Sequence, residues 1–353
     1  MGDTRLTEAA ARVRDGVVAP DHRKVVTPDA PRPSAPDGAS QDAAGRFDLF
    51  HFTLSVCSQK VRATLYEKGA GWRSNELVIF PPVNENYHPD YVRLRLMSEA
   101  AGASEAARGY SGATSVEDEG FDALVVPTLV DHEAGRVLTD SKRVCLYLDG
   151  ALDGPKLVPE TLRDAVLRQL SEVDRTPHAA LLYGADPEGD HRPDPVRGDM
   201  KGIHARKIEA VERNMALADG DARVLSAYEA KIEKERAAAR FVGDRDRMRG
   251  AVETTRDLLA RLEDVLRRGG GPWVLGEAFT LADVFWGVSL FRLQWLGYAG
   301  LWEGRSGDLP RVRLYADRLY RRPSIKHGVI EWPGHPPSPS VENLIPGEVR
   351  SPG

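Results

Sequence analysis

Residues 47–69 have the sequence FDLFHFTLSVCSQKVRATLYEKG and decide the fold of the first half of the chain. Residues 47–54 are mostly apolar or aromatic, which is typical of a strand buried on both faces. Apolar residues then recur at helical spacing through Val61, Leu65 and Tyr66, and Gly69 stands where a helix C-terminus favours glycine. The stretch therefore predicts a strand, a turn and a helix, with Cys57 in the first turn of that helix.

The following sequence predicts the rest of an α/β domain. Glu76–Phe80 has the pattern of a second short strand ended by two prolines, and a right-handed crossover would place it parallel to the first. Leu124–Val130 and Arg136–Leu138 predict a strand pair, after which helical periodicity returns over Asp140–Leu148. Strand, helix and strand followed by a hairpin and a helix is the order of a thioredoxin-like domain.

Composition divides the remainder of the chain. After the Gly- and Pro-rich link 150–159, strand patterns vanish and helical patterns dominate, which predicts an all-α second domain. Ser98–Asp122 and Gly184–Gly202 are too long for ordinary connections, so we expect them to be insertions that help to build a substrate pocket. The predicted organisation is a disordered extension (1–46), a thioredoxin-like thiol-binding domain (47–150), a helical substrate-binding domain (158–330) and a C-terminal tail (331–353).

Overall composition excludes several classes of function. There are 48 Lys and Arg residues against 53 Asp and Glu residues, so the formal charge is −5 and no basic surplus exists to neutralise nucleic-acid phosphates. No apolar stretch has the length of a membrane span, and residues 1–20 lack the apolar core of a signal sequence, so we expect a cytoplasmic location. The histidines show no spacing typical of a metal site or a catalytic triad, and no metal is expected.

Cys57 is the strongest candidate for chemistry. The amides at the start of its helix, together with Lys60 and Arg62, favour the thiolate form of a cysteine at this place. Redox enzymes of this fold usually carry a second cysteine three residues further on, where this chain has Lys60, so an external thiol would have to resolve any mixed disulfide. The alternative is a packed, inert cysteine. Cys145 stands among apolar residues and is expected to be a buried structural thiol.

Two further segments indicate a site for an extended, peptide-like ligand. Val126 and Pro127 begin an apparent interior strand, where a proline is costly unless its peptide bond is cis or the strand starts at an open edge. Backbone groups left free by this proline could bind a ligand as an added strand. Asp140 and Ser141 open the next helix and could hold an ammonium and a carboxylate, unless they only cap the helix. A thiol peptide with free amino and carboxylate ends would use all of these features.

The order of these motifs resembles that of the glutathione transferases. Cys57 follows the first strand, Val126–Pro127 and Asp140–Ser141 come next, and Thr280–Asp283 forms a capping box ahead of an apolar helix. The resemblance covers about residues 47–325. It implies an α/β N-terminal thioredoxin-like domain followed by an all-α glutathione-transferase domain, with glutathione as co-substrate.

Longer motifs resemble one group within that superfamily. The sequences FHFTLSVCSQKVR (50–62), NENY (84–87) and YVRLRL (91–96) are similar to those of the glutathione-dependent reductive dechlorinases of chlorinated hydroquinones. This resemblance implies a small aromatic substrate besides glutathione. It places the serine and the cysteine of that group on Ser55 and Cys57.

The same resemblance implies roles for the candidate residues. Glutathione would lie along Val126–Pro127 with its γ-glutamyl end on Asp140–Ser141, and its thiol would replace chloride on a quinoid tautomer of the substrate. Ser55 would orient the glutathione thiolate by a hydrogen bond. Cys57 would then attack the glutathionyl sulfur, and a second glutathione would free it from the mixed disulfide.

Three other functions remain open on the sequence. The chain could reduce glutathionyl hydroquinones without removing a halogen, act as a general glutathione transferase, or serve as a non-catalytic binding module with the transferase fold. Homodimers are common in the superfamily, although the two inserted segments could block the usual interface. The sequence leaves the choice between these alternatives to experiment.

Overall fold

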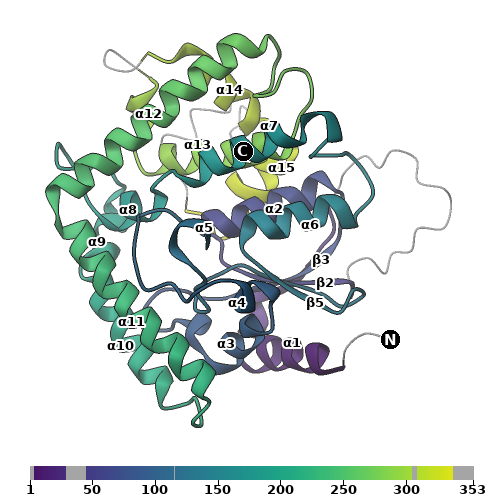
Figure 1. The fold of residues 1–353 in the computed structure, drawn as a ribbon, viewed down its shortest axis with the longest axis vertical. Helices are drawn as coiled ribbons and strands as arrows, with labels where there is room; N and C mark the ends of the chain where they lie inside the picture. Colours follow the sequence, from purple (N-terminus) through teal and green to yellow (C-terminus); the bar gives the residue numbers. More distant parts are fainter. Residues whose placement is uncertain (1–3, 29–44, 115, 304–307, 337–353) are drawn as a thin grey trace, which may run out of the picture.

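The sheet at the centre of the first domain has five strands. The structure is a computed structural model that describes residues 4–28, 45–114, 116–303 and 308–336. Strand order is β1-β3-β2-β4-β5 (Figure 1), with β2 and β3 parallel and the other neighbouring pairs antiparallel. The strands are β1 (Arg23–Val26), β2 (Phe47–His51), β3 (Trp72–Glu76), β4 (Thr128–Asp131) and β5 (Arg136–Thr139).

Helices cover both faces of this sheet. On one face α2 (Val56–Glu67) packs beside α6 (Ser141–Ala151), and on the other α1 (Thr4–Gly16) packs beside α3 (Pro89–Leu96), as Figure 1 shows. The predicted thioredoxin-like order and the parallel pairing of the first two predicted strands are confirmed. The inserted segment before β4 carries two short helices, α4 (Glu99–Ala103) and α5 (Val116–Glu119).

The second domain is all helical, as predicted. Its central helix, α13 (Leu281–Trp295), begins at the predicted capping box, and every one of its residues is buried. Helices α2, α7 and α14 pack against α13, so it joins the two domains through a shared core. The other helices are α7 (Arg163–Asp174), α8 (His178–Tyr183), α9 (Asp194–Met200), α10 (Ile203–Met215), α11 (Ala222–Gly243), α12 (Arg245–Gly269), α14 (Pro310–Tyr320) and α15 (Pro323–Ile325).

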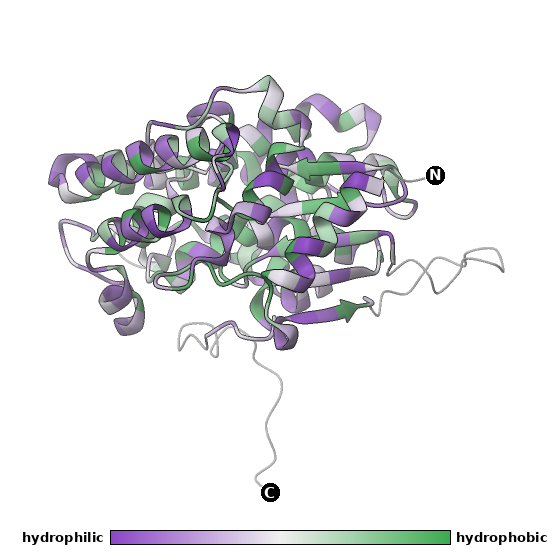
Figure 2. Ribbon diagram, turned by 90° about the horizontal axis from the view of Figure 1, so that it is seen from below, coloured by the Kyte–Doolittle hydropathy of each residue, from purple (hydrophilic) through white to green (hydrophobic). Residues whose placement is uncertain are grey.

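Short 3-10 and π turns complete the elements. They are η1 (Pro20–His22), η3 (Glu85–Tyr87), η4 (Glu160–Leu162), η5 (Ala299–Leu301) and the π-helical turn η6 (Lys326–Ile330). Hydrophilic and hydrophobic residues alternate along many of the helices (Figure 2), as expected where one face of a helix is buried. No helix in the described ranges is both long and apolar enough to cross a membrane.

The prediction that residues 1–46 are disordered is wrong for residues 4–26. Leu6, Ala10 and Val13 of α1 are buried in a cluster with residues of the sheet and α3, and β1 extends the sheet by pairing with β3. Composition misled here because small alanines contribute little hydropathy, although at helical spacing they allow close packing. Residues 29–44 of the predicted extension lie outside the described residues.

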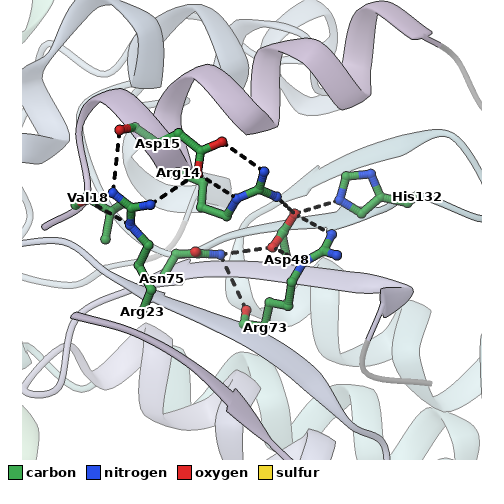
Figure 3. Close-up of polar contacts among 8 residues, drawn as sticks. All are labelled: Arg14, Asp15, Val18, Arg23, Asp48, Arg73, Asn75 and His132. Atoms are coloured by element: carbon green, nitrogen blue, oxygen red, sulfur yellow. Dashed lines mark hydrogen bonds and ion pairs between the residues drawn. The ribbon is translucent and has the colours of Figure 1, made fainter. Parts of the chain in front are cut away.

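A buried carboxylate fastens this N-terminal segment to the sheet. Asp48 of β2 is fully buried and accepts hydrogen bonds from Arg73 at 2.7 and 2.8 Å, from Asn75 at 3.0 Å and from the His132 ring at 2.7 Å (Figure 3). Arg14 of α1 reaches the same carboxylate at 3.7 Å. Burial alone would raise the pKa of Asp48, but the hydrogen bonds from His132 and Arg73 outweigh burial and hold that pKa well below its usual range.

The second predicted strand was placed too late in the chain. The strand is β3, Trp72–Glu76, and the apolar Leu77–Phe80 leaves the ladder after one hydrogen bond from the Leu77 amide to the His51 carbonyl, at 2.8 Å. Hydropathy missed β3 because its middle residues are polar. Ser74 and Asn75 are nevertheless buried, because Asn75 is paired with Asp48 and Ser74 with His51.

The prediction of a C-terminal tail from residue 331 is wrong for its first residues. Trp332 is buried, stacks on Trp72 with ring centroids 6.2 Å apart, and lies under the Arg62 guanidinium at 4.5 Å from its ring. The Pro333 carbonyl accepts a hydrogen bond from Thr53 at 3.3 Å. These contacts show that Trp332 belongs to the core and that Pro333 is anchored to Thr53, while 337–353 lie outside the described residues.

Candidate active site

One cavity of about 970 Å³ lies between the two domains and collects every residue predicted for the site. The lining residues include, from the sheet domain, Ser55, Cys57, Val126, Pro127, Asp140 and Ser141. Both inserted segments also contribute, through residues such as Tyr110, Asp122, His191 and Arg192. The helical domain supplies the opposite wall from α8, α10, α11 and α13.

Cys57 stands in the first turn of α2, as the sequence predicted. The helix begins at Val56, and Ser55 is its N-cap, whose hydroxyl accepts a hydrogen bond from the Ser58 amide at 3.2 Å. This cap leaves the Ser55 proton free to be donated to another group. Cys57 is partly exposed and is a free thiol, whereas Cys145 is fully buried. Burial raises the pKa of Cys145 to about 12, so this second thiol is unreactive near neutral pH.

The cations near Cys57 differ in part from those predicted. Lys60 lies on the same side of α2 and forms an ion pair with Asp174 at 2.7 Å. Burial lowers the pKa of Lys60, but Asp174 and then negative charge on Cys57 outweigh it and raise that pKa. Five residues after Cys57, Arg62 points elsewhere and donates to the carbonyls of Gly328, Phe52 and Thr53 at 2.9 to 3.2 Å. The expectation that Arg62 acts on the sulfur is therefore wrong.

Pro127 follows a cis peptide bond and immediately precedes β4. Because β4 lies between β2 and β5, the alternative of a strand starting at a sheet edge is wrong. The Pro127 carbonyl accepts a hydrogen bond from Arg95 at 2.6 Å. In contrast, no other described residue hydrogen-bonds to the backbone N–H or C=O of Val126, which lines the cavity. This peptide unit is open to an extended ligand.

Asp140 and Ser141 lie at the start of α6. Asp140 is the N-cap and accepts a hydrogen bond from the Arg143 amide at 3.1 Å, so capping is one of its functions. Burial raises the pKa of Asp140 above its ordinary value, a cost that a bound cation would reduce. Ser141 is 7% exposed and its hydroxyl has no hydrogen-bond partner among the described residues.

The opposite wall contains a buried ion cluster that the sequence did not indicate. Lys231 of α11 pairs with Asp122 at 2.9 Å and with Glu235 at 3.0 Å, and Glu235 also accepts from His204 of α10 at 2.7 Å. Lys234 pairs with Asp122 at 3.3 Å. All five residues line the cavity.

The sequence predicts helices in this region but no site. One signal was present: the buried positions of α11 include Val224, Tyr228, Lys231, Glu235 and Ala238. These positions follow helical spacing and form one buried stripe along α11. The stripe is continuous only when Lys231 and Glu235 are counted together with the apolar residues.

A further residue of this wall, Arg292 of α13, was also missed. It lines the cavity, is 3% exposed, and its guanidinium lies 5.0 Å from the centre of the Trp295 ring. Burial lowers the pKa of Arg292 to about 10, and its electrostatic interactions with Tyr183 and then with Cys57 oppose that effect. At neutral pH the group therefore remains a cation. It takes the place near Cys57 that the sequence assigned to Arg62.

Comparison with known families identifies the class of protein. Residues 54–151 match the model of the glutathione S-transferase N-terminal domain, and residues 214–318 match that of the glutathione S-transferase C-terminal domain. The chain therefore belongs to the glutathione transferase family, and the resemblance drawn from its motifs is confirmed.

Similarity to characterised relatives is much closer than family membership requires. The chain is 54% identical over 343 residues to the 2,5-dichlorohydroquinone reductive dechlorinase of Sphingobium indicum (strain UT26S), covering 96% of this chain and 98% of that protein. It is 25% identical over 291 residues to the tetrachloro-p-hydroquinone reductive dehalogenase of Sphingobium chlorophenolicum, covering 81% of this chain and 97% of that protein.

Solved structures agree on the fold. The beta-etherase LigF from Sphingobium sp. strain SYK-6 matches with a TM-score of 0.52 at 17% identity, covering 81% of this chain and 100% of that one. Identity at this level supports the architecture of two transferase domains.

Proposed function

We propose that this protein is a glutathione-dependent reductive dechlorinase of chlorinated hydroquinones. The observation that carries the proposal is the position of Cys57. Its partly exposed thiol opens on the same cavity as Ser55, Val126–Pro127 and Asp140–Ser141, and the chain's other cysteine is sealed in the core. The 54% identity to a 2,5-dichlorohydroquinone reductive dechlorinase supports this choice of substrate class.

Glutathione fits the sheet-domain wall of the cavity as an added extended strand. The free backbone N–H and C=O of Val126 would hydrogen-bond its cysteinyl unit. Its γ-glutamyl carboxylate would accept from the Ser141 hydroxyl and the amides that begin α6, and its ammonium would face Asp140, whose pKa is raised chiefly by desolvation. In this position the glutathione thiol lies toward Ser55 and Cys57.

The first chemical step removes chloride. With Ser55 donating a hydrogen bond to it, the glutathione thiolate forms a C–S bond to the chlorine-bearing carbon of a quinoid tautomer of the substrate, and chloride leaves with the electron pair of the C–Cl bond. Proton loss then restores the aromatic ring. The product of this step is a glutathionyl hydroquinone.

Cys57 performs the reductive step. Its thiolate attacks the glutathionyl sulfur of the conjugate in a quinoid tautomer, the C–S bond breaks, and the ring carbon keeps the electron pair and takes up a proton. A mixed disulfide of Cys57 with glutathione remains. A second glutathione thiolate attacks it, releasing oxidised glutathione and regenerating the Cys57 thiolate. Two glutathione molecules thereby supply the two electrons that replace C–Cl by C–H.

The absence of an internal resolving thiol agrees with this cycle. Residue 60 is lysine, and its ammonium is held by Asp174 at 2.7 Å. Reduction by an external thiol requires a compartment where thiols remain reduced, which fits the cytoplasm. A homodimer, common in this superfamily, is a further part of the proposal that size-exclusion chromatography with light scattering would test.

One experiment tests the proposal directly. The protein is incubated with glutathione and 2,5-dichlorohydroquinone while chloride, aromatic products and oxidised glutathione are quantified, and the Cys57 peptide is weighed by mass spectrometry after acid quench. We expect equal amounts of chloride and oxidised glutathione, and a glutathionyl mass on Cys57. Reduction of glutathionyl hydroquinones without any chloride release from dichlorohydroquinone would favour the alternative reductase. An unreactive Cys57 towards iodoacetamide near neutral pH would favour a non-catalytic binding module.

A further inference from the structure

Among the described residues, Arg292 differs from the other buried cations in having no hydrogen-bond or ion-pair partner. The residue is only 3% exposed. Within residues 4–28, 45–114, 116–303 and 308–336, however, its guanidinium forms no hydrogen bond and no ion pair. A buried cation without an anion or hydrogen-bond acceptor is strongly unfavourable, so such groups in folded proteins are normally paired. An unpaired guanidinium that lines a cavity therefore indicates a ligand that completes it.

Two other buried arginines show what pairing looks like in this fold. Arg62 donates to three backbone carbonyls and contacts the His51 ring nitrogen at 3.2 Å. Arg95 donates to the Pro127 carbonyl at 2.6 Å and to the Asp122 carbonyl at 3.0 Å. Both are fixed by the protein itself. Arg292 keeps all of its donors for the cavity.

The surroundings of Arg292 define the class of ligand. Trp295 on its own helix presents an aromatic ring 5.0 Å from the guanidinium, and Tyr183 and Cys57 are close enough to act on it electrostatically. His178 and His335 also lie near, and burial followed by cationic neighbours that include Arg292 lowers the pKa of each, so both rings are neutral at pH 7. A cation without an ion-pair partner, bordered by aromatic rings, suits a flat ring that carries one negative oxygen.

Resting on the proposed function, we infer that Arg292 binds an anionic oxygen of the aromatic substrate, the phenolate of a hydroquinone or the oxygen of its quinoid tautomer. Glutathione would bind at Val126 and Ser141 instead, through backbone groups and the Ser141 hydroxyl. Negative charge grows on the ring oxygen when thiolate adds to the quinoid ring, and a fixed guanidinium stabilises that charge. Arg292 thus sets both the orientation of the ring and the preference for ionisable phenols.

Binding of a chromophoric phenol tests this inference without turnover. The probe is 4-nitrophenol, whose phenolate absorbs visible light, and the background is Cys57→Ser, which cannot complete the cycle. In Arg292→Leu we expect the affinity for the phenolate to fall about 10- to 100-fold, the range for loss of a charge-assisted hydrogen bond. Arg292→Lys should recover part of it. The exposed Arg268→Gln, at the end of α12, removes one positive charge elsewhere and should leave affinity unchanged.

A neutral probe of similar shape separates the contribution of charge to binding from the contribution of packing. 4-Nitroanisole cannot ionise, so its affinity should be the same in the Cys57→Ser protein and in its Arg292→Leu derivative. Equal loss for both probes, or no loss for 4-nitrophenol, would overturn the inference. If 4-nitrophenol binding is unchanged while the pH profile of iodoacetamide reaction at Cys57 shifts in Arg292→Leu alone, the arginine acts on the thiolate and the inference also fails.

Thermal stability gives an independent readout. An unpaired buried cation costs stability, so Arg292→Leu should raise Tm, whereas a structural arginine such as Arg62 would lower Tm when replaced. A lower Tm in Arg292→Leu would show that the group already has a partner in the protein. Because none of these measurements requires dechlorination, phenolate binding through Arg292 can be confirmed even where chloride release is not observed, and the two proposals fail separately.

Discussion

The two walls of the cavity are built on different principles. The sheet-domain wall presents backbone groups: the first turn of α2 at Cys57, the open peptide unit at Val126 and the start of α6 at Ser141. The helical wall presents side chains, namely the ion cluster around Lys231 and the unpaired Arg292. Backbone-made sites follow from where strands and helices begin, and they suit a ligand common to a whole family. Side-chain sites depend on which residues meet across long sequence separations, and they suit a ligand particular to one protein.

Of the substitutions in the two walls, replacement of Cys57 is expected to have the largest effect on turnover. Cys57→Ser should retain chloride displacement, because that step uses the glutathione thiolate, but should accumulate glutathionyl hydroquinone and lose turnover to the dechlorinated product by several orders of magnitude. Liquid chromatography with mass spectrometry of the products would measure both steps.

The matched control is Cys145→Ala, which removes the other thiol from the core. It should cost some stability through the small cavity that it creates, while the products per folded enzyme remain those of the parent protein. Full turnover to dechlorinated hydroquinone by Cys57→Ser would disprove the role of Cys57 as the reductive thiol.

Removing one member of the ion cluster of the helical wall should lower the free energy of unfolding. Lys231→Met leaves Asp122 and Glu235 without their closest cation, and breaking buried ion pairs in this way typically costs about 3–5 kcal/mol in the free energy of unfolding. Urea denaturation would measure the loss. Lys201→Met, at an exposed position, is the control and should change the free energy of unfolding by less than about 0.5 kcal/mol. Equal stability of both variants would mean that water already solvates the cluster.

How far the sequence predicts the molecule depends on the same division between backbone and side chains. The strand, turn and helix around Cys57 could be predicted because the apolar run, the helical spacing after it and Gly69 all lie within one short stretch. The strand start after Pro127 and the helix start at Asp140 could be predicted for the same reason. Each marks a local change of backbone direction.

Pairings between distant residues could not be predicted in this way. Arg292 lies in a mostly apolar helix, and whether it has an ion-pair partner depends on every residue around it. The polar residues of β3 look unsuited to a buried strand until Asp48 of β2 is placed beside them. Trp332 likewise belongs to the core only because the chain end returns to Trp72. Each case depends on long-range contacts that one sequence does not display.

Ser55 caps α2 and, in the proposed mechanism, also donates to the glutathione thiolate, and a substitution should separate these two roles. Ser55→Ala removes the acceptor for the Ser58 amide, for which a loss of about 1 kcal/mol is typical. If Ser55 also donates to the glutathione thiolate, chloride release per folded enzyme should fall about tenfold, equivalent to about 1.4 kcal/mol of lost hydrogen bonding. Ser55→Thr keeps the hydroxyl and should preserve most of both properties. A stability loss without a change in chloride release would restrict Ser55 to capping.

The smallest expected effect at neutral pH concerns His335, at the chain end beside α13. Its ring lies 5.2 Å from that of Phe291 and 5.7 Å from that of Trp295, and burial lowers its pKa to about 4. An unfolded histidine has a pKa of about 6.5, so between these values the unfolded state binds more protons than the folded state. Acidification through this range should therefore reduce the free energy of unfolding, with no loss above it.

Buried His51 and His178 have pKa values lowered in the same direction, chiefly by burial, and add to this slope. His335→Gln removes one titrating ring, so the dependence of the free energy of unfolding on pH should become less steep, whatever its absolute value at pH 7. Urea denaturation at a series of pH values would measure both slopes. An unchanged slope in His335→Gln would mean that folding does not lower the pKa of this ring.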